Sequence, residues 1–152
     1  MKQTAIAVCG LLFLAALLYS SPAAVPAADV LKDPEWQQNY DAFDPNPALL
    51  AALREKIGVD LQVDVYFGFW CGDSKAHVPP FLKIVDTLHA EGLTVNYFEL
   101  PRKEKPEQRF FVEELKVERV PTFIFYRAGT EIGRIVENPT RGILEDFLAI
   151  VF

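Results

Sequence analysis

The stretch LQVDVYFGFWCGDSK, residues 61–75, decides the fold of this chain. Its first part, Leu61–Phe69, is rich in β-branched and aromatic residues, which predicts a strand. Side chains alternate along a strand, so the odd-numbered residues face one way and the even-numbered ones the other. The residues after it begin a helix that runs to Leu88, and Pro79-Pro80 must bend or restart that helix. Cys71 is therefore expected where a helix begins.

Elements on both sides of this stretch complete an α/β pattern. Further strands are predicted at Thr94–Leu100, Thr122–Tyr126 and Ile132–Val136, the last two joined by a hairpin turn at Ala128-Gly129-Thr130. Helices are predicted after Asp33-Pro34, over Pro47–Ile57 and Glu107–Lys116, and from a cap at Asn138-Pro139 to Val151. No internal repeat or linker divides the pattern, so one α/β domain is expected.

The N-terminal residues have the pattern of an export signal. Lys2 gives a short positive start and Ala5–Tyr19 is an apolar run. Val25-Pro26-Ala27 fits the small-residue cleavage rule, with Ser21-Pro22-Ala23 as a second candidate. The apolar run makes about 22 Å of helix, short of a bilayer core of about 30 Å. We therefore predict a cleaved signal peptide over residues 1–27 and a periplasmic or otherwise exported location. The alternative is an uncleaved N-terminal membrane anchor.

Cleavage would leave a mature domain, residues 28–152, with a single thiol. It removes Cys9 and keeps Cys71. That thiol is either free and reactive or paired with another molecule, including a second copy of the chain. The full chain has a formal net charge of −6, which argues against a basic nucleic-acid surface. One mature cysteine and two scattered histidines lack the spacing of a metal cluster, so neither a metal nor another cofactor is expected.

Three spaced features resemble the thioredoxin superfamily, over nearly all of the mature chain. They are Trp70-Cys71-Gly72 with Lys75, a helix-kinking proline at Pro79, and Val120-Pro121-Thr122 before a strand. The run around Cys71 looks closer still to a bacterial branch of thioredoxin-like proteins with a WCGDS-type site. The resemblance implies a thioredoxin-like α/β fold, with a central mixed sheet of about four or five strands flanked by helices. It also implies a cis peptide bond before Pro121.

Departures from that family distinguish this site from a dithiol reductase. Ser74 stands where a thioredoxin has its second, resolving cysteine, and Asp73 stands where it usually has proline. The buried acid of thioredoxin would fall at Val65, whereas Asp64 lies one position away and on the opposite face of the strand. The resemblance therefore supports the fold and a monothiol site rather than dithiol chemistry.

The start of a helix suits a nucleophilic cysteine. Unpaired backbone N–H groups and the helix dipole stabilise an anion at Cys71, Lys75 adds a positive charge, and Asp73 opposes it. The Ser74 hydroxyl can donate to the sulfur, and Trp70 is expected to pack beside the thiol and shield it. The alternative for Cys71 is a buried structural thiol.

Attack by Cys71 on a disulfide gives a mixed disulfide that Ser74 cannot resolve. A second thiol from the substrate, glutathione or a partner protein must release it. This chemistry suits disulfide isomerisation or deglutathionylation, with protein or small-molecule thiols and disulfides as partners. A cis bond at Pro121 would leave the backbone at Val120 free to pair with an extended substrate, so Val120, Pro121 and Thr122 are the predicted substrate-binding residues.

Two functional classes follow from these residues. The first is an exported monothiol thiol–disulfide oxidoreductase or isomerase. The second is a redox-inactive thioredoxin-fold binding or assembly module, in which the Pro121 edge recognises a partner and Cys71 is incidental. Peroxide or sulfenic-acid chemistry at Cys71 is a third alternative. A hydrolase triad of Asp73, Ser74 and His77 is disfavoured, because all three lie within about one helical turn.

Overall fold

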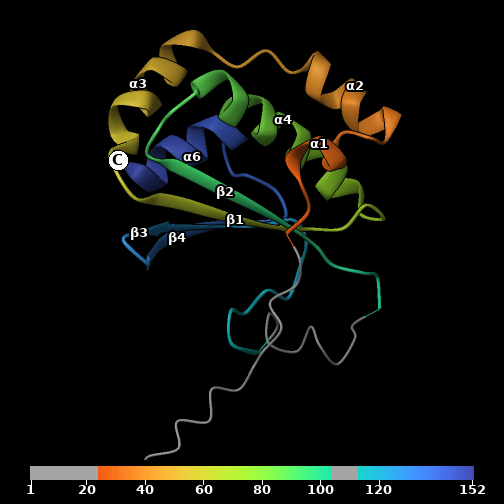
Figure 1. The fold of residues 1–152 in the computed structure, drawn as a ribbon. Coiled ribbons are helices and arrows are strands. Elements are labelled where there is room, and N and C mark those ends of the chain that lie inside the picture. The colour runs from red at the N-terminus through yellow and green to blue at the C-terminus, as the bar shows by residue number, and fades with distance from the viewer. Residues whose placement is uncertain (1–23, 104–112) are drawn as a thin grey trace, which may run out of the picture.

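The computed structural model describes residues 24–103 and 113–152. The elements are α1 (Ala27–Val30), α2 (Pro34–Ala42), α3 (Pro47–Ile57), β1 (Leu61–Phe67), α4 (Gly72–Leu88), β2 (Leu93–Glu99), β3 (Thr122–Arg127), β4 (Thr130–Val136) and α6 (Ile143–Val151) (Figure 1). The predicted signal peptide and the predicted helix over Glu107–Lys116 lie mostly outside the described residues. None of the described helices combines the length and the apolar character needed to cross a bilayer.

The strands form one mixed sheet in the order β2-β1-β3-β4. β1 runs parallel to β2 and antiparallel to β3, and β3 runs antiparallel to β4. The turn between β3 and β4 contains Ala128 and Gly129, whose φ angles of 48° and 77° suit a tight hairpin. The predicted mixed sheet and hairpin are confirmed. A backbone bridge from Val25 to Tyr97 also lies on the outer edge of β2.

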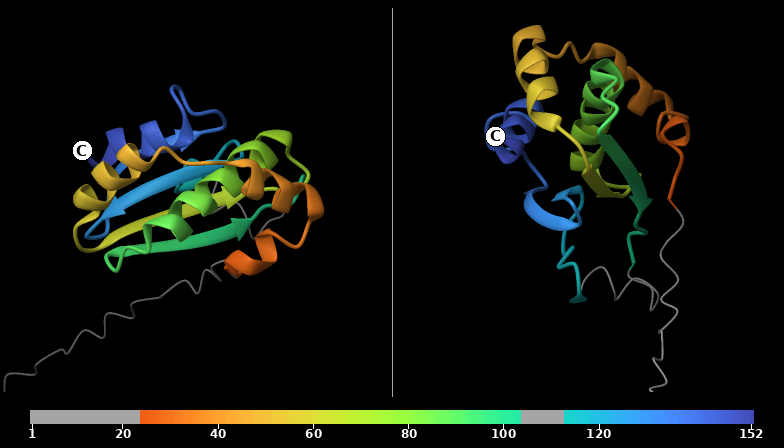
Figure 2. Two further views of the ribbon diagram at one scale, coloured as in Figure 1. Left: turned by 90° about the horizontal axis from the view of Figure 1, so that it is seen from above. Right: turned by 60° about the vertical axis from the view of Figure 1, so that its left-hand side comes forward.

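Helices α2, α3, α4 and α6 lie over one face of the sheet (Figures 1 and 2). The apolar core lies between them and the sheet. Val63, Val65 and Phe67 of β1 are each 0% exposed there, which confirms the predicted alternation. Phe81 of α4 stacks on Phe147 of α6 with ring centroids 5.6 Å apart. Because burying one such ring contributes about 1.5–3 kcal/mol, this face is where most of the apolar stabilisation arises.

The opposite face of the sheet, called the second face below, mixes polar and apolar side chains. Asp64 points to this side, away from Val65, as the sequence predicts. Its carboxylate accepts hydrogen bonds from the side-chain amides of Gln62 at 2.9 Å and Asn96 at 2.8 Å. A smaller apolar cluster also lies on this side: Tyr66, Leu100, Val117, Val120 and Ile124. The cluster packs the segment before β3 against the sheet.

Helix α4 continues through Pro79 and Pro80 and does not restart there. Pro79 has no N–H to offer the carbonyl oxygen of Lys75, one turn earlier. The side-chain amide of Asn39 on α2 donates to that oxygen at 2.9 Å. α2 therefore satisfies the carbonyl that the proline leaves unpaired, which explains why the two helices lie together.

The last helix starts later than the sequence predicts. Asn138-Pro139 is the predicted cap, but α6 begins at Ile143. The Asp146 carboxylate explains the difference, because it accepts from the backbone N–H of Thr140 at 2.5 Å and from the Arg141 side chain at 3.0 Å. These bonds hold the residues before α6 in a loop.

Candidate functional site

A short turn joins β1 to α4, and residues 68–74 are called the Cys71 turn below. α4 begins at Gly72 and Cys71 is its N-cap, which confirms the predicted position at a helix start. The Cys71 backbone N–H donates to the Gly68 carbonyl at 2.9 Å, and its carbonyl accepts from the Lys75 N–H at 3.1 Å. Cys71 is partly exposed and is the free cysteine of the described residues. The turn thus presents a thiol that solvent can reach.

Trp70 fixes the Cys71 turn against the end of β2. Its indole N–H donates to the Leu100 carbonyl at 2.8 Å, and the Leu100 N–H donates to the Phe67 carbonyl at 2.7 Å. A Cβ atom at Gly68 would lie 2.6 Å from Trp70 Nε1, so the turn requires glycine at this position. Trp70 is 46% exposed, and its role as a shield for the thiol stays a prediction. The Arg102 guanidinium lies 6.0 Å from its ring centroid.

Ser74 has a different partner from the predicted one. It is 0% exposed, and its hydroxyl oxygen accepts from the Gly68 backbone N–H at 3.2 Å. The sequence predicts a hydrogen bond from this hydroxyl to the sulfur of Cys71. In the structure the Cys71 thiol instead bonds to the backbone of Val120. Ser74 therefore closes the turn and keeps the Gly68 N–H satisfied.

Val120 belongs to the segment of residues 113–121, called the proline loop below. The peptide bond between Val120 and Pro121 is cis, as the resemblance implies. The Cys71 thiol donates to the Val120 carbonyl oxygen at 3.2 Å, so two predicted site segments meet although they are far apart in the sequence. The thiol uses one of the two lone pairs of this carbonyl oxygen. Pairing of the Val120 backbone with an extended substrate stays a prediction.

The other predicted substrate-binding residues are mostly enclosed. Pro121 is buried and Thr122 is only 1% exposed. The Thr122 hydroxyl donates to the Arg119 carbonyl at 2.6 Å, which tightens the end of the proline loop. Contact between these residues and a substrate stays a prediction, and the position of Thr122 favours a structural role.

The two charged residues near Cys71, Lys75 and Asp73, lie in different surroundings. Lys75 forms an ion pair with Glu35 of α2, and the hydrogen bond in that pair raises the pKa of Lys75. Its charge is thus shared with α2 rather than directed at the thiol alone. Asp73 lies half-buried in the first turn of α4. A Cβ atom at Gly72 would meet nothing within 4 Å, so this position of the turn has room for a side chain.

The structure does not assemble the hydrolase grouping of Asp73, Ser74 and His77. The His77 Nε2 atom lies 2.9 Å from the Asn138 side-chain oxygen, while Ser74 is buried and bound to Gly68. Across residues 24–103 and 113–152, no group of three histidine, cysteine or acidic side chains could hold a metal ion.

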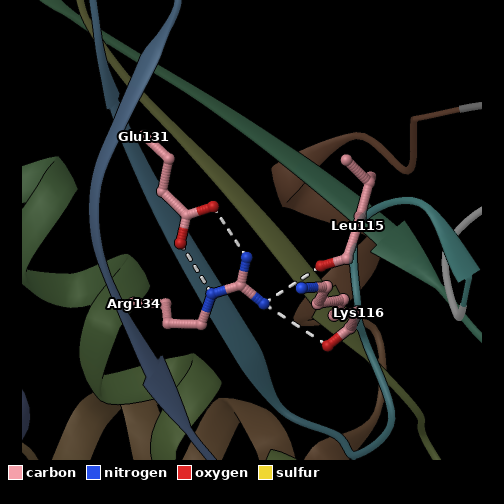
Figure 3. Close-up of polar contacts among 4 residues, drawn as sticks. All are labelled: Leu115, Lys116, Glu131 and Arg134. Carbon is pink, nitrogen blue, oxygen red and sulfur yellow. Dashed lines mark hydrogen bonds and ion pairs between the residues drawn. The ribbon is translucent and has the colours of Figure 1, made fainter.

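Sequence reasoning missed the side chains on the second face that hold the proline loop. Arg134 of β4 donates to the Leu115 carbonyl at 3.0 Å and to the Lys116 carbonyl at 3.3 Å (Figure 3). Its remaining bonds go to the Glu131 carboxylate, at 2.6 and 2.7 Å. Tyr126 lies on the same face, where burial raises its pKa to about 12. Glu131 precedes the predicted strand Ile132–Val136 and Arg134 lies within it, and neither position indicates a contact with residues 115–116.

No family model matches the chain. It is 31% identical over 71 residues to a curated thioredoxin from Malassezia sympodialis, a match that covers 47% of this chain and 63% of that protein. A solved structure of a Pseudomonas aeruginosa protein of unknown function superposes with a TM-score of 0.60 at 16% identity, over 76% of this chain and 79% of that one. Mitochondrial thioredoxin 3 from Saccharomyces cerevisiae superposes with a TM-score of 0.43 at 26% identity, over 66% and 88% of the two chains. The chain has a thioredoxin-like fold, with its mixed sheet and flanking helices.

Proposed function

We propose that this chain performs thiol–disulfide exchange with Cys71 as its nucleophile, as a monothiol protein with a WCGDS-type site. One observation carries the proposal: a partly exposed cysteine, Cys71, is the N-cap of α4 and lies beside the proline loop. The similarity to a curated thioredoxin supports it. Because this chain spans only 63% of that relative, its activity, substrates and partners are all part of the proposal.

The exchange takes place in two balanced steps. Cys71 releases its proton to solvent and its sulfur attacks one sulfur of a substrate disulfide. A bond forms between those two sulfurs, the substrate S–S bond breaks, and its other sulfur leaves as a thiolate. A second thiol from outside the chain then attacks the mixed disulfide, and Cys71 leaves with the electron pair and takes up a proton. The chain is neither oxidised nor reduced over the cycle.

The need for an external thiol defines the expected partners. Ser74 is buried and carries a hydroxyl, so it cannot displace a bound substrate from Cys71. Release therefore falls to a thiol of the substrate itself, to glutathione or to a partner protein. Disulfide isomerisation and deglutathionylation both supply such a thiol, and net reduction of a protein disulfide by this chain alone does not.

A binding or assembly module is the second candidate, and the hydrogen bond from Cys71 to Val120 favours it. That bond joins α4 to the proline loop, which is a structural use of a thiol. A serine at position 71 could donate to the same carbonyl. In this case Cys71→Ser keeps the partner, whereas the exchange function requires the sulfur.

We also propose that the chain is exported to the periplasm or anchored facing it, on the basis of the signal pattern in residues 1–27. Expression from its own start codon in a bacterium, followed by fractionation and N-terminal sequencing, tests this location. A shortened periplasmic chain supports cleavage and a full-length membrane-bound chain supports the anchor. A full-length cytoplasmic chain contradicts export.

Capture of mixed disulfides in that cell tests the function. Acid quenching and alkylation preserve disulfide adducts, which are then identified by non-reducing gels and mass spectrometry. Wild-type chain is expected to carry disulfide-linked adducts that reductant releases, with Cys71→Ser as the matched control. A native pull-down with the same two chains tests the alternative. If Cys71→Ser retains the same proteins there, without a disulfide link, the binding module is supported instead.

A further inference from the structure

An irregularity in the hairpin places two charged side chains on the second face. Tyr126 pairs with Glu131 whereas its neighbour Phe125 pairs with Gly133, so Ile132 is an extra residue in β4. Such a bulge shifts the alternation of side chains along a strand. Glu131 therefore shares a face with Arg134, although residues three apart in a regular strand face opposite ways.

Arg134 and Glu131 form a bidentate ion pair. Arg134 Nε and one terminal nitrogen donate to the two oxygens of Glu131 at 2.6 and 2.7 Å. The side chains are 27% and 37% exposed, so both are partly removed from water. A bidentate carboxylate fixes the plane of a guanidinium group. The remaining terminal nitrogen of Arg134 is thereby aimed in one direction.

That nitrogen reaches the beginning of the proline loop. It donates to the carbonyl oxygens of Leu115 and Lys116 (Figure 3). Lys116 has a φ of 53°, a left-handed conformation that costs a residue other than glycine about 1–2 kcal/mol. A strained residue persists where its surroundings hold it, and Arg134 binds the carbonyls on both sides of this strain.

The end of the proline loop is also fastened to β4. The Glu137 backbone N–H, directly after β4, donates to the Pro121 carbonyl at 2.7 Å. The Glu137 side chain pairs with Arg119 at 2.7 Å. Between these two anchors lies Val120, whose carbonyl accepts the Cys71 thiol.

We propose that Arg134 is a positioning residue, which sets the place of the Val120 carbonyl and Pro121 against Cys71 by holding the start of the proline loop. The inference rests on the proposed exchange function and deepens it, because it names a residue outside the motif that determines which disulfides react. An extended peptide disulfide needs both the sulfur and the loop, whereas a small aromatic disulfide needs the sulfur alone. Arg134 therefore selects for extended substrates.

Arg127 supplies a matched control. It is also an arginine of the β3–β4 hairpin that donates to two backbone carbonyls, those of Ile57 and Lys56, each at 3.2 Å. It pairs with Leu61 at the start of β1, whereas Cys71 follows the other end of that strand. Arg127→Gln therefore removes comparable bonds from the same sheet without touching the proline loop.

The test compares rates of mixed-disulfide formation at Cys71 with two substrates, an extended peptide disulfide and a small aromatic disulfide. Arg134→Gln is expected to slow the peptide reaction about tenfold or more and to change the small-disulfide reaction less than about twofold, because misplacement affects only the substrate that needs the loop. Arg127→Gln is expected to leave both rates within about twofold of wild type. Equal effects of Arg134→Gln and Arg127→Gln on the peptide reaction would overturn the inference.

A second measurement does not depend on the exchange function. Brief trypsin digestion with mass spectrometry follows cleavage after Lys116 and Arg119, the two cleavable residues of the proline loop. Arg134→Gln is expected to accelerate both cuts while Arg127→Gln does not, and unchanged cutting would overturn the anchoring role. If wild-type chain reacts with neither disulfide, the exchange function fails, and this digestion still decides whether Arg134 holds the loop.

Discussion

The Cys71 turn and the proline loop meet at one hydrogen bond, but they are held in different ways. The turn is closed by its own residues: Ser74 accepts the Gly68 N–H, and the Cys71 N–H returns to the Gly68 carbonyl. The loop is held mainly from outside, by Arg134 and Glu137 at the two ends of its attachment to β4. One half of the site is therefore a local structure, and the other depends on the sheet.

This difference separates two ways of changing the site. Substitutions within the turn act on the thiol and on the stability of the β1–α4 junction together. Substitutions on β4 act on the loop and leave the thiol in place.

The largest effect on stability is expected at Gly68. Gly68→Ala puts a methyl group into the indole of Trp70, which the Leu100 carbonyl holds in place, and overpacking of this kind costs about 1–3 kcal/mol. Gly72→Ala is the matched control in the same turn, because its methyl group meets nothing within 4 Å. That change is expected to stabilise the chain by up to about 1 kcal/mol, since alanine restricts the unfolded chain. Urea unfolding measures both, and similar midpoints for the two variants would contradict this description of the turn.

The second effect concerns resolution of the mixed disulfide. Ser74→Cys places a thiol one helical turn from Cys71, where it becomes an intramolecular reactant. The variant is expected to reduce a small exposed protein disulfide at least about tenfold faster than wild type, since it releases its own mixed disulfide. Insulin turbidity measures this activity, with Cys71→Ser/Ser74→Cys as the control. An inert Ser74→Cys would show that the inferred geometry of the turn is wrong.

The stability of the chain is expected to fall at alkaline pH because of Tyr126, which lies on the second face of the sheet. Burial raises the pKa of Tyr126 from its ordinary value of 10.0 to about 12, so folding favours its neutral form. The resulting stabilisation is complete below pH 10 and is lost as the pH rises through about 12. Tyr126→Phe is therefore expected to lose less stability over this interval than wild type, as measured by urea unfolding at successive pH values. Identical alkaline losses for both chains would contradict the assignment to Tyr126.

The smallest effect is expected at the exposed end of the loop. Arg119 and Glu137 form an ion pair with side chains 65% and 33% exposed, and such pairs contribute little because water competes for both charges. Arg119→Gln is expected to change the peptide exchange rate by less than about twofold, in contrast to Arg134→Gln. Stopped-flow measurement of both variants checks the order. If Arg119→Gln slows the peptide exchange more than Arg134→Gln does, the loop is held mainly at its end, by Arg119, and not at its start.

The sequence predicts the position of Cys71 in the local half of the site, but not the partner of Ser74, which binds the Gly68 N–H rather than the sulfur. The alternation in Leu61–Phe69 and the cysteine after it are sufficient to place Cys71 at a helix start, because these are interactions between near neighbours. The cis bond at Pro121 follows from resemblance to a family rather than from local chemistry. The sequence does not predict the hydrogen bond from the Cys71 thiol to the Val120 carbonyl, because it assigns that backbone only to pairing with a substrate.

The remote half could not be predicted in the same way. The partnership of Glu131 and Arg134 depends on a bulge at Ile132. Gly133 beside it is a residue type that often marks a bulge in a strand, but it does not identify the partners of these two side chains. The Asn39 amide that satisfies the carbonyl opposite Pro79 belongs to another helix. Both features arise from tertiary packing, which periodicity along one strand or helix does not encode.

The central claim is that Cys71 is a nucleophile that releases its substrate to an outside thiol. Intact-mass spectrometry of the purified chain, first mixed with a peptide disulfide and then with excess glutathione, tests it most directly. The expected result is one peptide adduct at Cys71, followed by loss of the adduct and recovery of the free thiol. A chain that forms no adduct while folded, although Cys71 is alkylated once the chain is unfolded, would contradict the claim.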